Sequence, residues 1–454
     1  GAPPPALEHS PRAPPRPACP RARQSRAQFC LRPRLPRKML CAAIAFSAAV
    51  SWELRSRSVS LHESKAYNVT TEEYFSSGVT LRPGHMIFTN PRKTRLEMPA
   101  GRYAITGFWG DIVDADHKPV PLSKIYDHHW VAVNNRHRNE ICETVPYVFG
   151  VGAESRHNPV NLPAGYGYVV DETVEWGANI HLLRIDGLSE AAAKECNECY
   201  YAPGKGKECT VAQNGTFKCC GERDYDGVGS CPAQRADLPA ETFYLRYRVS
   251  YTRELAAVAP VHISVATAPD CATFYAVLRD ERSPEHLAQY EFETATDVTV
   301  LFAAGHQHVG ALNISLFVNE RRVCTSYPRY GAERGVAGDE LGYLVQMSPC
   351  ADASTGPLAW TKGDTVRIDS WYSVAPHDPR LQYSDGTHLN VMGYMYMVYT
   401  RGEDADSHSP LLRPPSPGRE DPLDGFAMLQ APLEGSTVRG TRVWKRVPLQ
   451  AAAA

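Results

Sequence analysis

The central part of the chain alternates apolar and polar residues with a period of two, and this pattern limits the folds that it can adopt. Residues 242–251 carry Phe, Leu, Tyr or Val at every second position, and residues 312–316 and 365–369 alternate similarly. Gly, Pro and Asp separate such runs, and long amphipathic helical patterns are absent between residues 52 and 402. The alternation predicts strands buried on one face, and therefore an all-β, sandwich-like fold.

Two domains would account for the length of the chain. Its 454 residues are enough for two hydrophobic cores of ordinary size. We expect two tandem antiparallel β-sandwich domains, jelly-roll-like, at residues 52–256 and 257–402, because a strand ends in the run at 255–260. The tail at 403–454 is rich in Pro, Ser and acidic residues, and we expect it to be disordered.

Charge is distributed unevenly along the chain. The formal net charge is −2, but residues 1–38 hold nine basic residues and one acidic residue. The remainder has 39 basic and 49 acidic residues, a net charge of −10. Because an acidic protein repels polyanions, we expect no nucleic-acid partner.

The leader at residues 1–51 has the features of a secretory signal peptide behind a disordered segment. Met39 is the first methionine, two basic residues precede the apolar run at 40–50, and small residues follow at Ala49 and Ser51. We expect translation to start at Met39 and the product to be secreted, in preference to an organelle transit peptide or a merely disordered leader. The run is too short for a membrane span, so we expect no integral membrane segment in the mature chain.

Cysteine and asparagine patterns fit an exported protein. Ten cysteines follow the leader, and an even number in an exported chain predicts disulfides whose pairing stays open. The CxxC at 196–199 would suggest zinc in a cytosolic protein, whereas disulfides are expected here. Glycosylation sequons begin at Asn68, Asn214 and Asn313. The ten cysteines are Cys142, Cys196, Cys199, Cys209, Cys219, Cys220, Cys231, Cys271, Cys324 and Cys350.

Three histidine patterns are candidates for metal binding. His306 and His308 are two residues apart, so in a strand their side chains share a face and can converge on one metal ion; a hydrogen-bonded surface pair is the alternative. His128 and His129 are adjacent, so a regular strand would point them in opposite directions, and a shared metal requires a bulge or turn. His181 lies in an apolar run and equally fits a core histidine.

A methionine in a later strand adds a softer ligand. In residues 390–399, Met392, Tyr394 and Tyr396 share one face, and two further methionines share the other. Any one methionine here is compatible with core packing. A thioether beside two imidazoles favours Cu(I), however, and three imidazoles suit either copper state, whereas zinc seldom recruits a thioether.

Over residues 60–400 the chain resembles the stress up-regulated nodulin family. The supporting segments are 127–131, 152–156, 219–220, 244–247, 305–308 and 326–331. More distantly, the order His-His, His, His-x-His and Met before a Tyr-rich strand is similar to that of the copper type II, ascorbate-dependent monooxygenases of the peptidylglycine and dopamine type.

The distant resemblance implies two copper ions and assigns a role to each candidate residue. His128, His129 and His181 would hold the electron-donating copper. His306, His308 and Met392 would hold the oxygen-binding copper, and Tyr396 would line the substrate pocket. Ascorbate would be the reductant.

The chain also departs from the peptide-hydroxylating pattern. Ala304 stands where that enzyme has a carboxylate-binding Arg, and Tyr394 stands where it has an Asn. Losing the Arg removes a bidentate clamp, so the substrate is left open. The sequence predicts a secreted copper-dependent monooxygenase-like protein that hydroxylates an unknown small substrate with O2 and ascorbate. A non-catalytic extracellular copper-binding stress glycoprotein, or a structural glycoprotein, is the alternative.

Overall fold

The structure is a computed structural model that describes residues 66–143, 145–186, 198–199, 216–217, 239–277, 283–373, 390–402 and 423. The expected signal peptide, the expected disordered leader and all but one residue of the tail lie outside these ranges, as does the Asn214 sequon. The regular secondary structure of the described part is almost entirely strands, with two short 3-10 turns, η1 (Ser155–His157) and η3 (Leu255–Ala257). The all-β prediction is therefore confirmed.

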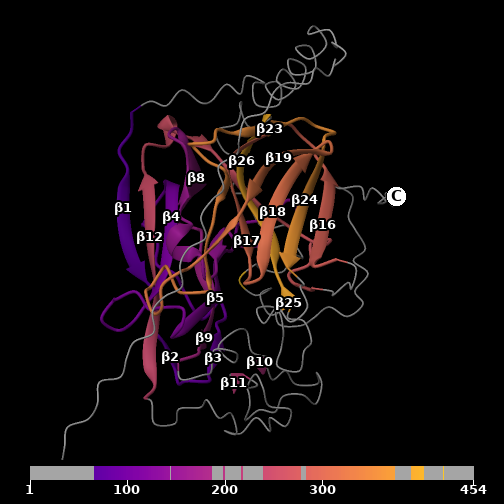
Figure 1. Ribbon diagram of the computed structural model, residues 1–454. Coiled ribbons are helices and arrows are strands. Elements are labelled where there is room, and N and C mark those ends of the chain that lie inside the picture. The colour runs from indigo at the N-terminus through magenta and orange to yellow at the C-terminus, as the bar shows by residue number, and fades with distance from the viewer. Residues whose placement is uncertain are drawn as a thin grey trace, which may run out of the picture. The chain divides into compact units, whose positions relative to one another are not determined.

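Two sheets form a first sandwich (Figure 1). The outer N-terminal sheet has the order β1 (Thr70–Phe75), β12 (Glu241–Thr252), β4 (Tyr103–Val113), β8 (Tyr166–Val170) and β13 (Ala259–Pro260), with β2 (Val79–Leu81) on β12 and β7 (Val160–Asn161) on β4. The inner N-terminal sheet has the order β3 (Met86–Phe88), β9 (Trp176–Arg184), β5 (Ile125–Asn134) and β6 (Phe149–Val151). Phe108 of the outer sheet stacks on Phe149 of the inner sheet, with ring centroids 4.4 Å apart.

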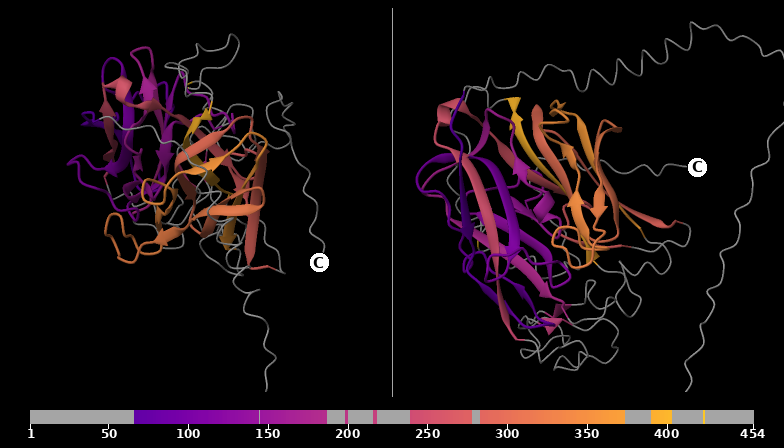
Figure 2. Two further views of the ribbon diagram at one scale, coloured as in Figure 1. Left: turned by 90° about the horizontal axis from the view of Figure 1, so that it is seen from above. Right: turned by 60° about the vertical axis from the view of Figure 1, so that its left-hand side comes forward.

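Two further sheets form a second sandwich (Figure 2). The inner C-terminal sheet has the order β14 (His262–Thr267), β26 (Gly393–Arg401), β17 (Val298–Gln307) and β22 (Pro349–Ala351), with β23 (Leu358–Trp360) on β17. The outer C-terminal sheet has the order β16 (Glu285–Glu293), β24 (Thr365–Ser373), β18 (Ala311–Val318) and β19 (Arg321–Ser326). Short pairs are β15 (Tyr275–Ala276) with β25 (Asn390–Val391), β20 (Pro328–Tyr330) with β21 (Leu344–Met347), and β10 (Glu198–Cys199) with β11 (Thr216–Phe217).

Burial distinguishes β12 of the outer N-terminal sheet from β5 and β9 of the inner one. In β12 the side chains of Phe243, Leu245, Tyr247 and Val249 are fully buried and their neighbours are half-buried or exposed, as the alternation predicts. In contrast, every residue of β9 is buried, and so is every residue of β5 except His128. Strands that are covered on both faces are buried continuously rather than alternately.

The two inner sheets are covered because they pack against each other. One hydrophobic cluster joins Val131 and Phe149 of the first sandwich to Phe302, Tyr396 and Val398 of the second. The opposite face of β26 instead packs into the second sandwich's own core. Among the described strands, no sheet mixes residues from before and after Val261, so the chain passes between the sandwiches at that residue.

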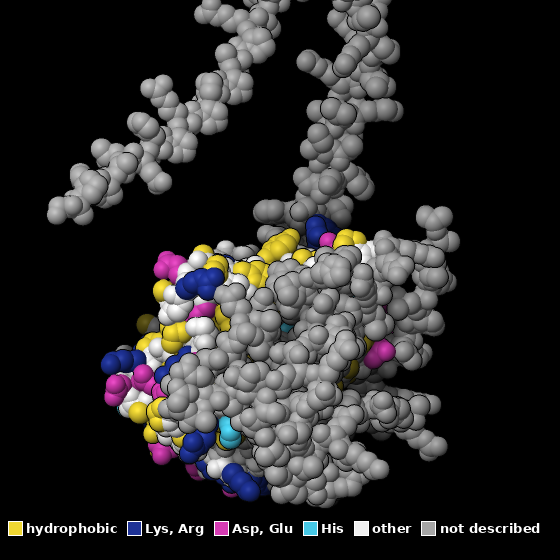
Figure 3. Space-filling view, turned by 60° about the horizontal axis from the view of Figure 1, so that its bottom comes forward, with side chains coloured by type: hydrophobic (Ala, Val, Ile, Leu, Met, Phe, Trp, Pro, Cys, Tyr) yellow, Lys and Arg dark blue, Asp and Glu magenta, His cyan; other side chains and the backbone are white. Residues whose placement is uncertain are grey.

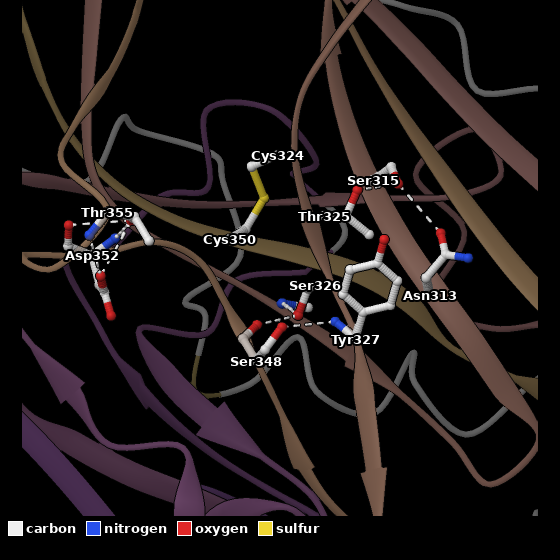
Figure 4. Close-up of a disulfide and its surroundings, with 11 residues drawn as sticks. Asn313, Ser315, Cys324, Thr325, Ser326, Tyr327, Ser348, Cys350, Asp352 and Thr355 are labelled. Atoms are coloured by element: carbon white, nitrogen blue, oxygen red, sulfur yellow. Dashed lines mark hydrogen bonds between the residues drawn. A yellow bond between two sulfur atoms is a disulfide. The ribbon is translucent and has the colours of Figure 1, made fainter. Parts of the chain in front are cut away.

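Two disulfides reinforce this arrangement. Cys142 of the first sandwich is bonded to Cys271 of the second, across 129 residues of sequence. Cys324 on β19 is bonded to Cys350 on β22, which joins the two sheets of the second sandwich (Figure 4). The disulfide prediction is thus confirmed for four cysteines, and the side chains of the other six lie outside the described part.

Two further features are the distribution of charge on one face and the length of the helices. On the face shown in Figure 3, the described Lys and Arg side chains are interspersed with Asp and Glu. Within the described residues, no helix has the length and apolar character needed to cross a membrane.

The Cys142–Cys271 disulfide is expected to contribute strongly to stability, because it closes a long loop. Replacing both cysteines by Ser should lower the free energy of unfolding by about 2–5 kcal/mol. As a matched comparison, replacing Cys324 and Cys350 by Ser opens a loop of only 26 residues. This replacement should lower the free energy of unfolding by less. Urea denaturation followed by Trp fluorescence measures both, and a larger loss from the shorter loop would contradict the expectation.

Candidate metal centre

A β-bulge brings the adjacent histidines to one side of the inner N-terminal sheet. In the antiparallel pairing of β5 with β9, His129 is the register partner of His181, so their side chains lie on the same face. The register shifts between Asp127 and His129, which makes His128 the extra residue. The bulge that the sequence requires for a shared metal is therefore present.

The three histidines have the spacing of metal ligands. One ring nitrogen of each, in His128, His129 and His181, lies within 4.8 Å of the others. The Nδ1 atoms of His128 and His129 are 3.3 Å apart. Two ligands in a tetrahedron with bonds near 2.0–2.1 Å are separated by about 3.3 Å, so the observed spacing fits one metal ion.

Asn179 fixes the ring of His129. The Nε2–H of His129 donates to the Asn179 side-chain oxygen at 3.0 Å, and the Asn179 amide donates to the Thr89 carbonyl. This bond directs the lone pair of Nδ1 toward His128, as partners of metal-bound histidines commonly do. Burial, followed by the neighbouring His181, lowers the pKa of His129 well below its ordinary value, which keeps the ring neutral and able to bind a cation.

Sequence reasoning missed Asn179, although a signal was present. Asn179 precedes His181 by two residues, the same spacing that drew attention to His306 and His308. In a strand that spacing places both side chains on one face.

The second pair of histidines faces the first set across the inner sheets. His306 and Gln307 are the last two residues of β17, and His308 is the first residue after the strand. Their ring centroids are 5.5 Å apart. The rings of His128 and His308 are closer still, with centroids 4.6 Å apart. The two ligand sets, expected on separate domains, therefore adjoin.

Glu154 of the first sandwich contacts His306 of the second. The Nδ1–H of His306 donates to the Glu154 Oε1 atom at 2.5 Å. The Nε2 atom of His306 is buried and has no hydrogen-bond partner within the described residues. A nitrogen left in this state is available to a metal ion. Glu154 lies in the 152–156 segment that carried the family resemblance, but a role for it was not predicted.

Met392 lies next to the second pair. In the pairing of β17 with β26, Gln307 is opposite Gly393, which places Met392 beside His308. The Tyr372 hydroxyl holds the two backbones together, because it accepts from the His308 N–H at 2.6 Å and donates to the Met392 carbonyl at 2.8 Å.

A cavity of about 490 Å³, including its open mouth, reaches ligands of both sets. His129, His306 and Met392 line it, and the other lining residues are Val131, Val145, Tyr147, Gly150, Val151, Thr273, Phe274 and Tyr394. Tyr394 therefore occupies the position beside the metal ligands. Tyr396 does not line this cavity: its hydroxyl is buried and donates to the Val148 carbonyl at 2.8 Å.

The donor set fits copper. Ring nitrogens of His128, His129 and His181 cluster, the His308 ring adjoins that of His128, and Met392 lines the same cavity as His129 and His306. Four of these five imidazoles are buried, and the Nε2 of His306 has no hydrogen-bond partner within the described residues. Imidazoles alone would also suit zinc, whereas the thioether at Met392 favours the soft Cu(I) ion.

Tyr372 is expected to hold His308 and Met392 in register. Tyr372→Phe leaves two buried backbone groups without their partner, which should cost about 1–3 kcal/mol of unfolding free energy in the metal-free protein. Tyr275→Phe is a matched control, because within the described residues its buried hydroxyl bonds only to the Ser370 hydroxyl, which Gln307 also contacts. Chemical denaturation compares them, and an equal or smaller loss for Tyr372→Phe would contradict this role.

Comparisons with known proteins identify a family. One similar solved structure is the PBCV-1 virus capsid, with 7% sequence identity over 74% of this chain and 94% of that chain and a TM-score of 0.26. Another is PNGF-II, with 10% sequence identity over 70% of this chain and 61% of that chain and a TM-score of 0.27. At these scores neither likeness supports a conclusion about the fold or the function. Among proteins with curated descriptions, none matches. The stress up-regulated Nod 19 family matches residues 67–144 and 132–401, so the chain belongs to that family.

Proposed function

We propose that this chain is an exported, copper-dependent, monooxygenase-like protein that hydroxylates a small substrate with O2 and ascorbate. The proposal combines the sequence pattern of the ligands with their geometry. The observation that carries it is the cavity: one apolar space touches His129 of the first set and His306 and Met392 of the second. A substrate in this space would lie within reach of both ligand sets. Two disulfides support export.

Some residues of the site would bind the copper ions, and others would position those ligands. His128, His129 and His181 would hold one ion, and His306, His308 and Met392 would hold the other. Copper in such sites supplies one-electron transfer and dioxygen chemistry. The protein's own contribution is to fix the ligands through Asn179 and Glu154 and to keep bulk water from the reacting groups.

The cavity also limits the class of substrate. Its lining contains no Lys, Arg, Asp or Glu within the described residues, and Ala304 replaces the arginine of the peptide-hydroxylating pattern. Binding a carboxylate there would leave that charge without a bidentate partner. The proposed substrate is therefore small, uncharged and mostly apolar.

The alternative function is non-catalytic copper binding in a stress response. Deep burial of the ligands favours it: the side chains of His129, His181, His306 and His308 are only 4–7% exposed. Copper held there would be shielded from solvent, which suits sequestration as well as catalysis.

Copper loading of single variants tests the ligand assignment. The purified wild type should bind two copper ions. Met392→Leu, which keeps the volume but removes the thioether, should weaken Cu(I) binding far more than Cu(II) binding. Met397→Leu is the matched control, because Met397 lies on the same strand but packs into the second core. His181→Ala should remove one ion, and because the rings of His128 and His308 adjoin, it should also perturb the spectrum of the other.

Oxygen uptake separates the two functions. With ascorbate and a set of small apolar candidate substrates, a monooxygenase consumes O2 in step with product, and either Met392→Leu or His181→Ala should abolish it. A protein that only binds copper would show the loading pattern without substrate-dependent uptake. A wild-type stoichiometry near zero would refute the copper assignment altogether.

A further inference from the structure

Glu154 is a buried acid that belongs to one sandwich and acts on the other. It follows β6 of the first sandwich and immediately precedes η1, and its side chain is fully buried. Its Oε1 atom accepts the hydrogen bond from His306 on β17 of the second sandwich. Its Oε2 atom is also buried and has no hydrogen-bond partner in the described part of the chain.

The backbone before Glu154 is wedged between the two ligand sets. A Cβ atom added at Gly152 would lie 2.3 Å from the His128 carbonyl oxygen and 3.1 Å from the His306 ring. Only glycine fits at such a distance from a backbone atom. The segment 152–154 thus contacts a histidine of each set.

Stability alone does not explain why a carboxylate stands here. Burying one costs free energy unless hydrogen bonds and charge partners compensate. No arginine or lysine is paired with Glu154 among the described ion pairs, and one of its oxygens is unsatisfied. The arginine two residues later is paired with Asp111 and Glu340 instead.

We propose that Glu154 is a positioning residue for the metal centre. It holds His306 in the tautomer whose Nε2 lone pair points to the metal, and its negative charge makes that imidazole a stronger ligand. Carboxylates on the far nitrogen of a metal-bound histidine act in this way. Because Glu154 and His306 come from different sandwiches, the second ligand set gains this hydrogen-bond partner only when the sandwiches are docked. This inference rests on the metal-binding part of the proposed function.

Glu340 is a matched control for a purely structural role. It is also a fully buried glutamate that crosses between the sandwiches, accepting from the Leu122 N–H and from Arg156 of the first. Its contacts do not include any of the candidate ligands. Glu340→Gln should therefore weaken the docking of the sandwiches without changing how His306 binds metal.

The experiment compares Glu154→Gln, Glu154→Ala and Glu340→Gln with the wild type in the full chain. Three quantities are measured: unfolding in denaturant, affinity for copper by competition with a chelator of known strength, and the tautomer of His306 by nitrogen NMR without metal. Glu154→Gln should lower the affinity of one copper site by ~10–100-fold. Glu154→Ala should lower it further and release the fixed tautomer. Glu340→Gln should lose stability with copper affinity within about twofold of the wild type, well below that change.

Each contrary result has a distinct meaning. Unchanged copper affinity in both Glu154 variants would overturn the positioning role and leave the proposed function standing. An equal loss of affinity in Glu340→Gln would assign Glu154 to docking alone and overturn the proposal as well. A wild-type protein that binds no copper would overturn both the proposed function and this inference. This outcome is distinct from the others because it is seen in the wild type, before any variant is compared.

Discussion

The inner N-terminal sheet and the inner C-terminal sheet bury each other, and the position of every candidate ligand depends on that contact. Polar groups in such a layer lose their water, so each needs a partner or a ligand. Apolar residues such as Val131 and Phe302 fill most of the layer. The candidate histidines are among the polar exceptions, and the His128 ring at the bulge adjoins the His308 ring.

Local patterns predicted much of the fold and named the histidines that the structure brings close together. The alternation in β12 predicted which face of that strand is buried. The spacing of His306 and His308 predicted that their side chains lie close together, and their ring centroids are 5.5 Å apart. The continuous burial of β5 and β9 could not be read as alternation, because both faces are covered. Contacts between the sandwiches, such as Glu154 with His306, join residues 152 positions apart and leave no periodic trace in the sequence.

Tyr394 and Tyr396 of β26 differ in whether they line the cavity, and the resemblance had assigned that position to Tyr396. Tyr394 and Tyr396 share a face, as the alternation predicts, so either could have reached the cavity. The structure places Tyr394 beside His306 and Met392 and commits the hydroxyl of Tyr396 to the Val148 carbonyl. Tyr394, at which the chain departs from the distant monooxygenase pattern, therefore lines the cavity. Under the proposed function, this change would alter which substrate fits.

Charge balance explains why acids accompany the histidines. Asp127 immediately precedes the bulge and is buried, and like Glu154 it has one oxygen without a hydrogen-bond partner among the residues that the structure describes. Burial, and then the nearby charge of Glu154, raises the pKa of Asp127 well above its usual range. A bound cation would oppose that shift, because its positive charge would favour the ionised form of Asp127. An apolar core would exclude both acids, whereas a centre that holds cations gains from each of them.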